Sequence, residues 1–402
     1  MYVAHLALAN FRNYAALEQE LPAGLILLEG ENAQGKSNLL EALFFLATSR
    51  SPRTNRDGEL LSWRIESAES VATRLFARVV RAAEEVTLEI LLMASAKGEG
   101  RSAQVARAEE ELLASAASGL QKRIRVNGVT RRAIDFLGTF RVVLFRPEDL
   151  ELVSGPPAGR RRALDILLSQ IETRYPRALQ RYGRVLQQRN HLLRRIAEGR
   201  AAPEELEPWD ESLVKEGAYV LAQRFTALDA LTGMAAQYHE PLSGGRERLT
   251  AAYISTIAPR ADIASDGDAL AAAFRGQLIA VRTRDIALGQ TTVGPHRDDL
   301  SLLVDGAAAS TYGSRGQQRT VALAWKLAEA RYLRETTGED PVVLLDDVLS
   351  ELDASRRRCV LEAVKDYQQV FLTSTGAELV GETLHTDAGF LVRSGQLTPL
   401  GA

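Results

Sequence analysis

Two strand-like runs and one helix-like run open the chain. The first covers residues 3–8, and the second, from Gly24 to Glu29, is apolar at nearly every position, which is typical of a strand buried on both faces of a sheet. A glycine-containing loop over residues 30–37 follows. Apolar residues then recur at helical spacing, at Leu39, Leu40, Ala42, Leu43 and Leu46. The pattern predicts a strand, a glycine loop and a helix, in that order.

Polar and apolar positions alternate in three further segments, at 74–80, 86–92 and 123–127. An alternation of period two predicts half-buried antiparallel strands, and Asn127-Gly128 is a hairpin signal. The Ala/Glu-rich stretch near Lys97 to Gly119 is expected to be a loop. These segments therefore predict an antiparallel addition to the first strands.

A helical lobe is predicted after the Pro/Gly-rich stretch at 154–159. Apolar residues recur in steps of three and four from Leu164 to Leu186, and Pro176 is expected to interrupt or restart the helix. The helical pattern resumes at Pro208 and continues to Tyr238, and it ends near the glycines at 244–245.

The last third of the chain returns to alternating helices and strands. A helix is predicted over 318–335, an apolar strand over 342–345, a helix after Asp353 and a strand over 370–372. The predicted fold class is α/β. One lobe is built from both chain ends, residues 1–150 plus 285–402, and a helical lobe is inserted between them at 151–284.

Composition and charge exclude several classes of protein. The chain has 402 residues, a net charge of −3 and one cysteine, Cys359. A single cysteine allows neither an internal disulfide nor a cysteine-cluster metal site, and the bulk charge gives no basic signature. The first residues lack a signal-peptide pattern, and no run is long and apolar enough to span a membrane. We expect a cytoplasmic protein without a membrane partner.

The glycine loop fits the pattern G-x-x-x-x-G-K-[ST], in the strand–loop–helix context that this pattern requires. Such a loop turns backbone N–H groups toward phosphates, the lysine adds a charge, and the hydroxyl binds Mg²⁺. The alternative is a chance turn before a helix. The residues expected to contact the nucleotide are Gly30, Glu31, Asn32, Ala33, Gln34, Gly35, Lys36, Ser37 and Asn38.

Two carboxylates follow the apolar strand at 342–345. We expect Asp346 to hold Mg²⁺ together with Ser37, and Asp347 to polarise the water that attacks the γ-phosphate. Lys36, Asp346 and Asp347 are thus the predicted catalytic residues, and ATP and Mg²⁺ the predicted cofactors. The alternative is an ordinary surface turn after a strand.

The segment from Thr311 to Gln318 precedes the helix that leads to this acid pair. Its place resembles that of the signature segment of ABC-type ATPases, and residues 350–353 resemble their D-loop. This resemblance implies that Ser314, Gly316 and Gln317 reach the nucleotide held by a second copy, at a helix N-terminus. The alternative for this segment is a plain Ser/Gly helix cap. The usual switch histidine is absent, and Thr373 lies in the segment that takes its place.

Further blocks make the chain resemble the RecF family, a branch of the SMC-like ABC ATPases, over most of its length. In chain order these blocks are residues 6–14, 30–41, 145–150 and 294–299. The resemblance implies a slow, DNA-stimulated ATPase whose ATP-dependent homodimer binds gapped DNA or single-strand/double-strand junctions. It also implies RecO and RecR as partners in loading recombinase, and release of DNA on hydrolysis.

Two of these blocks keep open alternatives. The block at 145–150 is either a Q-loop-like segment with Glu148 or Asp149 near the metal, or a plain helix cap. The block at 294–299 gathers a histidine, an arginine and two acids. It either contacts nucleotide, DNA or the other lobe, or forms a salt-bridged structural turn.

A local excess of positive charge marks the helical lobe. Between Arg160 and Arg200 the chain has eleven arginines against three acidic residues, which would suit salt-sensitive binding to DNA phosphates. The alternative is a solvated helix face. The DNA-binding candidates are Arg160, Arg161, Arg174, Arg177, Arg181 and Arg184, with Arg50, Arg53, Arg56, Lys122, Arg123, Arg131 and Arg132 as further ones.

Three other functions are alternatives to this one. A structural-maintenance ATPase with long arms needs sustained heptads, which the helical lobe lacks, so only a version without the coiled coil stays open. A transporter subunit would need the switch histidine and a membrane partner. The last is a non-hydrolysing, ATP-gated DNA clamp in another repair step, which the intact acid pair opposes.

Overall fold

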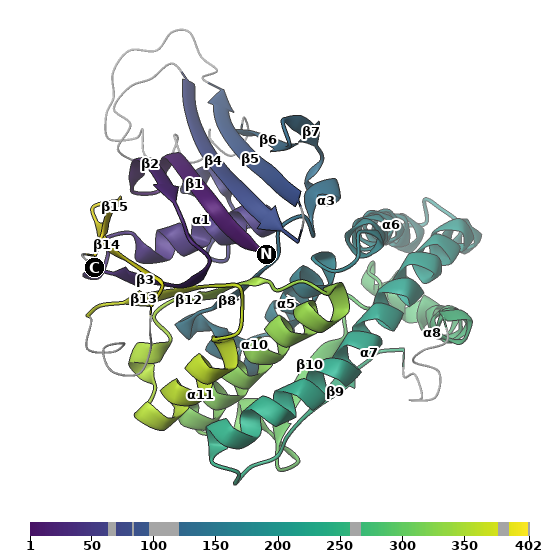
Figure 1. The fold of residues 1–402 in the computed structure, drawn as a ribbon. Coiled ribbons are helices and arrows are strands. Elements are labelled where there is room, and N and C mark those ends of the chain that lie inside the picture. The colour runs from purple at the N-terminus through teal and green to yellow at the C-terminus, as the bar shows by residue number, and fades with distance from the viewer. Residues whose placement is uncertain (63–69, 83, 96–119, 258–266, 377–385, 401–402) are drawn as a thin grey trace, which may run out of the picture. The chain divides into compact units, whose positions relative to one another are not determined.

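The computed structural model describes residues 1–62, 70–82, 84–95, 120–257, 267–376 and 386–400 (Figure 1). The expected loop at 97–119 lies outside them. The chain divides into two compact units: the first joins Met1–Pro147 to Leu333–Ala402, and the second is Glu148–Tyr332. Both chain ends therefore belong to one unit. By their contacts, residues 285–332 belong to the second unit. The sequence motifs had grouped these residues with the lobe that is built from both chain ends. The roles of the two lobes stay predictions.

The first unit contains a six-stranded sheet in the order β15-β14-β3-β13-β12-β8. Of its five pairings, three join a strand from the first part of the chain to one from the last part, and all five are parallel except that of β14 with β15. The strands are β3 (Gly24–Glu29), β8 (Val142–Phe145), β12 (Val342–Leu345), β13 (Gln369–Ser374), β14 (Ala388–Arg393) and β15 (Gln396–Pro399). The apolar runs read from the sequence are buried here, as parallel strands covered on both faces require.

A second six-stranded sheet of this unit is antiparallel, in the order β2-β1-β4-β5-β6-β7. Its strands are β1 (Tyr2–Phe11), β2 (Tyr14–Glu20), β4 (Ser70–Arg81), β5 (Glu84–Ser95), β6 (Leu120–Val126) and β7 (Val129–Arg131). Helix α1 (Lys36–Thr48) contacts β4 and β5 of this sheet and β8 and β13 of the first. The helix thus lies between the two sheets (Figure 1), which explains why it is apolar almost all round.

Short elements complete the first unit. They are η1 (Asp57–Leu60), α3 (Ala133–Phe136), η5 (Leu349–Glu351) and α11 (Ala354–Val364). The 3-10 helix η2 (Pro147–Leu150) stands in the chain at the border of the two units.

The second unit is mainly helical. Its helices are α4 (Glu151–Ser154), α5 (Pro157–Ser169), α6 (Arg174–Ala197), η3 (Pro203–Leu206), α7 (Glu207–Ser243), α8 (Gly267–Leu288), α9 (Ala309–Tyr312) and α10 (Arg315–Thr337), whose last turn belongs to the first unit. A small antiparallel sheet has the order β11-β10-β9. Its strands are β9 (Leu249–Ile254), β10 (Asp299–Val304) and β11 (Ala307–Ala308).

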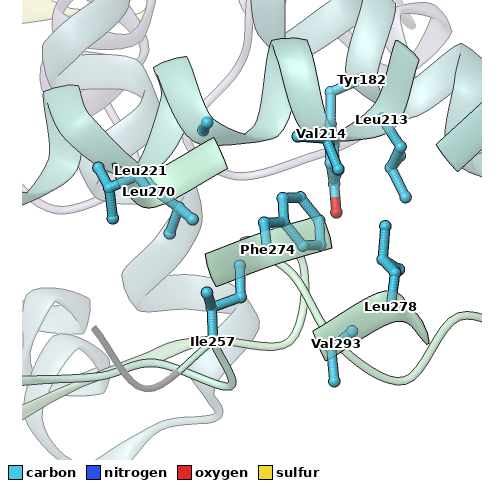
Figure 2. Close-up of a cluster of buried hydrophobic side chains, with 10 residues drawn as sticks. Tyr182, Leu213, Val214, Leu221, Ile257, Leu270, Phe274, Leu278 and Val293 are labelled. Carbon is cyan, nitrogen blue, oxygen red and sulfur yellow. The ribbon is translucent and has the colours of Figure 1, made fainter. Parts of the chain in front are cut away.

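Phe274 of α8 lies at the centre of the helical core (Figure 2). Side chains of α6, α7 and α8 and of two loops surround it: Tyr182, Leu213, Val214, Leu221, Ile257, Leu270, Leu278 and Val293. A methyl group at Gly217 of α7 would come 2.4 Å from the Phe274 ring. The glycine therefore allows α7 and α8 to approach closely.

The α/β fold with strands from both chain ends is confirmed, and so are the strand at 24–29 and the helix that ends at Gly244. Pro176 lies in the first turn of α6, after a break that follows α5. The sequence did not predict β8, β9 or β10, because such short runs carry weak periodicity and their pairing is non-local. Helix α8 was not predicted either. No helix among the described residues is long and apolar enough to cross a membrane.

Candidate nucleotide site and signature segment

The glycine loop joins β3 to α1 and takes backbone conformations that favour glycine. Gly30 has φ 156° and Gly35, the N-cap of α1, has φ 118°. A Cβ at Gly35 would come 2.6 Å from Nδ2 of Asn13, and one at Gly30 would come 2.4 Å from the Val392 carbonyl. Both positions therefore require glycine, and the loop wraps tightly at the start of a helix, as phosphate binding demands.

The turn between β1 and β2 is hydrogen-bonded to the glycine loop. Asn13 donates its side-chain amide to the Gln34 carbonyl at 2.9 Å, and the Tyr14 hydroxyl donates to the Gly35 carbonyl at 2.9 Å. The turn between β14 and β15 adds a contact, since the Ser394 N–H donates to Oε1 of Gln34 at 2.8 Å. The side chain of Gln34, one of the predicted nucleotide contacts, is thus engaged with this turn. The sequence predicted no separate role for the block at 6–14. In the structure, its residues Asn13 and Tyr14 support the glycine loop.

Lys36 is buried, and its ammonium points back into the loop. It donates to the carbonyls of Gly30 at 2.5 Å and Glu31 at 2.9 Å. Burial lowers the pKa of Lys36, while Asp347 and Asp346 oppose that shift. The charge therefore lies where phosphate oxygens would be its natural partners.

Ser37 and Asp346 lie together although they are far apart in the chain. The Ser37 hydroxyl donates to Oδ1 of Asp346 at 2.7 Å, because β3 and β12 both end at the same edge of the parallel sheet. A hydroxyl beside a carboxylate is the oxygen donor set that Mg²⁺ takes in nucleotide sites. The pair predicted to bind the metal is thus brought into contact.

Asp347 adopts a strained backbone conformation, with φ 54°. Its N–H donates to the Thr373 hydroxyl at 2.7 Å, and that hydroxyl lies 3.3 Å from Oδ1 of Asp346. Oδ1 of Asp347 is buried and has no hydrogen-bond partner among the described residues. An unmatched carboxylate in a strained turn is typical of a functional position. Thr373, in the segment that takes the place of the switch histidine, therefore contacts both acids.

A pocket of about 190 Å³ opens at this edge. Its lining residues come from the loop, from α1 and from the acid pair: Asn32, Ala33, Gly35, Lys36, Ser37, Asn38, Arg53 and Asp347. The glycine cradle, the buried lysine and the unmatched carboxylate oxygen together fit a triphosphate with Mg²⁺.

Arg53 was expected among the further DNA-binding candidates, but it lines the nucleotide pocket. It donates to Oδ1 of Asn38 at 2.9 Å and lies 3.7 Å from Oδ2 of Asp346. Lys122, another of those candidates, donates to the Ser49 carbonyl at 2.8 Å and pairs with Asp57 at 2.8 Å. Sequence proximity to the loop was the only signal for Arg53, because its approach depends on the chain folding back after α1.

The acid pair continues into the D-loop-like segment. Ser350 donates its hydroxyl to the Asp347 carbonyl at 2.8 Å. Asp353 caps α11 by accepting the backbone N–H groups of Ser355 and Arg356, and these hydrogen bonds lower its pKa. The cap fixes the start of α11 directly after the acids.

The signature segment stands exposed in the second unit. Gln317 donates its N–H to the Ser314 hydroxyl oxygen at 3.2 Å, and its side-chain oxygen accepts the Ser314 N–H at 2.8 Å. This reciprocal pair is a capping box at the start of α10. Ser314 and Gly316 are exposed, and Tyr312 beside them is 76% exposed. The side chain of Gln317, another predicted nucleotide contact, is engaged with Ser314 through its oxygen and with Glu247 through its nitrogen.

The block at 294–299 is bound into the second unit. The Pro295 carbonyl accepts from the buried Arg224 at 2.7 Å, and Nδ1 of His296 lies 2.6 Å from the Tyr182 hydroxyl. Burial lowers the pKa of His296 to about 4. These contacts favour the structural alternative for this block. Glu148 and Asp149 lie in η2, and their proposed place near the metal stays a prediction.

The six candidate arginines fall into two groups. Arg160 pairs with Asp299 at 2.8 Å and Arg161 donates to the Asp298 carbonyl at 2.6 Å, so both hold the block at 294–299. The other four are exposed on α6: Arg174, which stacks on Tyr219, and Arg177, Arg181 and Arg184. The steps between 177, 181 and 184 place them along one helix face.

Comparisons with known proteins agree with this geometry. The family model of the RecF/RecN/SMC N terminal domain matches residues 2–395. The DNA replication and repair protein RecF of Roseiflexus castenholzii is 44% identical over 407 residues, covering 99% of this chain and 100% of that protein. The RecF of Chloroflexus aggregans is 43% identical and covers 99% of each.

Solved structures give the same assignment. The recombination mediator protein RecF with ATP, of the RecFOR pathway, matches with a TM-score of 0.83 and 31% identity, over 100% of this chain and 98% of that one. The Smc head domain of Pyrococcus furiosus matches with a TM-score of 0.52 and 15% identity, over 99% and 96%, which shows a shared fold. The chain therefore belongs to the RecF family of SMC-like ABC ATPases.

Proposed function

We propose that this chain is an ATP-dependent DNA-binding repair protein that dimerises around ATP and holds DNA in the closed state. The observation that carries the proposal is the convergence of Lys36, the Ser37–Asp346 pair and the unmatched Asp347 at one sheet edge. The exposed Ser314 and Gly316 supply the other half of the site, from a second copy. The ATP-bound relative supports the choice of nucleotide.

Each group has a separate task in this site. The loop N–H groups and Lys36 bind the phosphates, and Asp347 orients the attacking water and accepts its proton. Ser37 and Asp346 hold Mg²⁺, which neutralises phosphate charge when bound. We expect slow, DNA-stimulated turnover, because Asp347 is shorter than a glutamate would be and one copy holds only half of the site.

The DNA would be gapped or carry a single-strand/double-strand junction, and hydrolysis would release it. The exposed arginines of α6 supply phosphate contacts that do not depend on base sequence. RecO and RecR are the proposed partners in loading recombinase, since the solved relative is a recombination mediator of the RecFOR pathway. The proposed location is the cytoplasm.

The test is sedimentation of the wild type, Lys36→Arg and a matched control, Lys215→Arg, which changes an exposed lysine of α7. Each is run with ATP and Mg²⁺, with and without a gapped duplex. We expect the wild type and Lys215→Arg to dimerise and retain DNA only with ATP, and Lys36→Arg to do neither.

Two other outcomes would change the proposal. A wild type that stays monomeric under every condition would remove the role given to Ser314 and Gly316. A wild type that dimerises and retains DNA but releases no phosphate would make the protein a non-hydrolysing clamp.

A further inference from the structure

The capping box of the signature segment is held by a residue from another part of the second unit. Nε2 of Gln317 donates to Oε1 of Glu247 at 2.9 Å. Glu247 belongs to the loop between α7 and β9, seventy positions earlier in the chain. The other side of Gln317 makes the capping contact with Ser314. One amide therefore joins the signature segment to the end of α7.

Glu247 lies near a buried histidine, and the residue after it is hydrogen-bonded to a neighbouring turn. Its Oε2 lies 3.6 Å from Nε2 of His239, which is fully buried in the last turns of α7. The next residue, Arg248, exchanges two hydrogen bonds with Asp305 in the turn after β10, each of 2.9 Å. The hydrogen bonds between Arg248 and Asp305 thus hold the loop that carries the Glu247 carboxylate.

The chemistry of a carboxylate decides how the Gln317 amide is oriented. An ionised glutamate only accepts hydrogen bonds, so it draws the NH₂ group of Gln317 toward itself. The amide oxygen must then face the Ser314 N–H, which needs an acceptor. Since the Ser314 oxygen already accepts from the helix, its O–H is left to donate outward.

We propose that Glu247 is a positioning residue for the signature segment: it fixes the amide of Gln317 and, through it, the hydroxyl of Ser314 that meets the nucleotide of a second copy. This inference rests on the proposed function.

Three substitutions at one position separate the alternatives. Glu247→Gln keeps a hydrogen-bond acceptor for Gln317, and Glu247→Ala removes it. Glu247→Lys offers a donor instead, so the Gln317 amide would flip to present its oxygen to the lysine. Its NH₂ group would then face the Ser314 N–H, which is also a donor. The matched control is Glu240→Ala, an exposed glutamate close by on α7. The measurements are ATP affinity of the dilute monomer, ATP-driven dimerisation, and turnover as a function of protein concentration.

We expect the dimer dissociation constant to rise about tenfold in Glu247→Ala and further in Glu247→Lys, since a hydrogen bond to a charged group is lost. Glu247→Gln and Glu240→Ala should stay within about threefold of the wild type. The monomer's ATP affinity should not change, because the P-loop is untouched. Adding Glu247→Ala to Gln317→Ala should cause no further loss, because Glu247 acts through the Gln317 amide.

Hydrogen exchange of the backbone amides at 314–318 in the monomer gives a readout that does not depend on dimerisation or on catalysis. It should be faster in Glu247→Ala and Glu247→Lys, and unchanged in Glu247→Gln and Glu240→Ala. If the wild type dimerises and Glu247→Lys does so equally well, with unchanged exchange, only this inference is overturned. If the wild type itself does not dimerise, the proposed function fails and the inference fails with it.

Discussion

Two buried groups of charges in this protein are built in opposite ways. In the nucleotide pocket, Lys36 turns to carbonyls of its own loop and Oδ1 of Asp347 meets no hydrogen-bond donor among the described residues. In the helical unit, the fully buried Arg189 donates to Asp210 at 2.7 Å, to Asp285 at 2.8 Å and to the Thr291 hydroxyl at 2.8 Å. The first group has room for a ligand, whereas the second already pairs its cation with two carboxylates, and only Nη2 of Arg189 lacks a hydrogen-bond partner among the described residues of that group.

The difference separates function from folding. A buried charge with no partner costs stability and is kept where a ligand or a reaction uses it. Removing one partner of a buried ion pair is strongly destabilising, because the other charge stays buried without compensation. Substitutions in the pocket should therefore change activity and leave stability alone, while substitutions around Arg189 should do the reverse.

The largest expected effect is the loss of turnover in Asp347→Asn. Removing a general base lowers turnover by about 10²- to 10⁴-fold, while stability should stay equal or rise, because asparagine tolerates the left-handed backbone and carries no buried charge. Phosphate release measures turnover, and urea unfolding measures the free energy of unfolding. The control is Asp366→Asn at an exposed position. Full turnover in Asp347→Asn would show that another group activates the water.

Arg189→Ala should give the largest loss of stability. It leaves Asp285 buried without its cation, and we expect the free energy of unfolding to fall by about 3–5 kcal/mol. Arg184→Ala, on the exposed face of the same helix, should change it by less than about 0.5 kcal/mol. Equal urea midpoints for the two variants would mean that the comparison of buried groups is wrong.

A smaller effect is expected from His296, whose pKa burial lowers to about 4. In the unfolded chain this histidine takes up a proton near its ordinary pKa of about 6.5. Its contribution to the free energy of unfolding is therefore complete above about pH 6.5, and it declines as the pH falls toward 4. Between pH 7 and 5 the loss from this residue should be about 2 kcal/mol. Urea unfolding of wild type and His296→Gln at both pH values measures it. Parallel pH curves would contradict a buried neutral histidine.

Local patterns were enough to locate the nucleotide site. The apolar strand, the loop from Gly30 to Ser37 and the acid pair after a second apolar strand are each short and local. Parallel strands bring their carboxyl ends to one edge of a sheet, so the contact of Ser37 with Asp346 follows from these patterns. Arg53 entered the site without such a signal, since only the folded chain brings it to the acids.

The helical lobe was harder to interpret, because the same residue type has opposite roles along it. Arg184 is exposed, whereas Arg189 lies at 0% exposure on the face of α6 that also carries Tyr182 and Leu193. The positions 182, 186, 189 and 193 form one helical stripe. An arginine within an apolar stripe was the available signal for a buried ion pair, and counting net charge over the lobe concealed it.

The sequence by itself determined the α/β class, the strand–loop–helix unit and the acid pair, because these depend on periodicity and on neighbours in the chain. Only the tertiary structure decided which arginines are exposed, which side chains of the predicted site are occupied elsewhere, and which residue orients the signature segment. Gln34, Gln317 and Glu247 show the reason. Their partners are distant in sequence, and a hydrogen bond leaves no periodic trace in the chain.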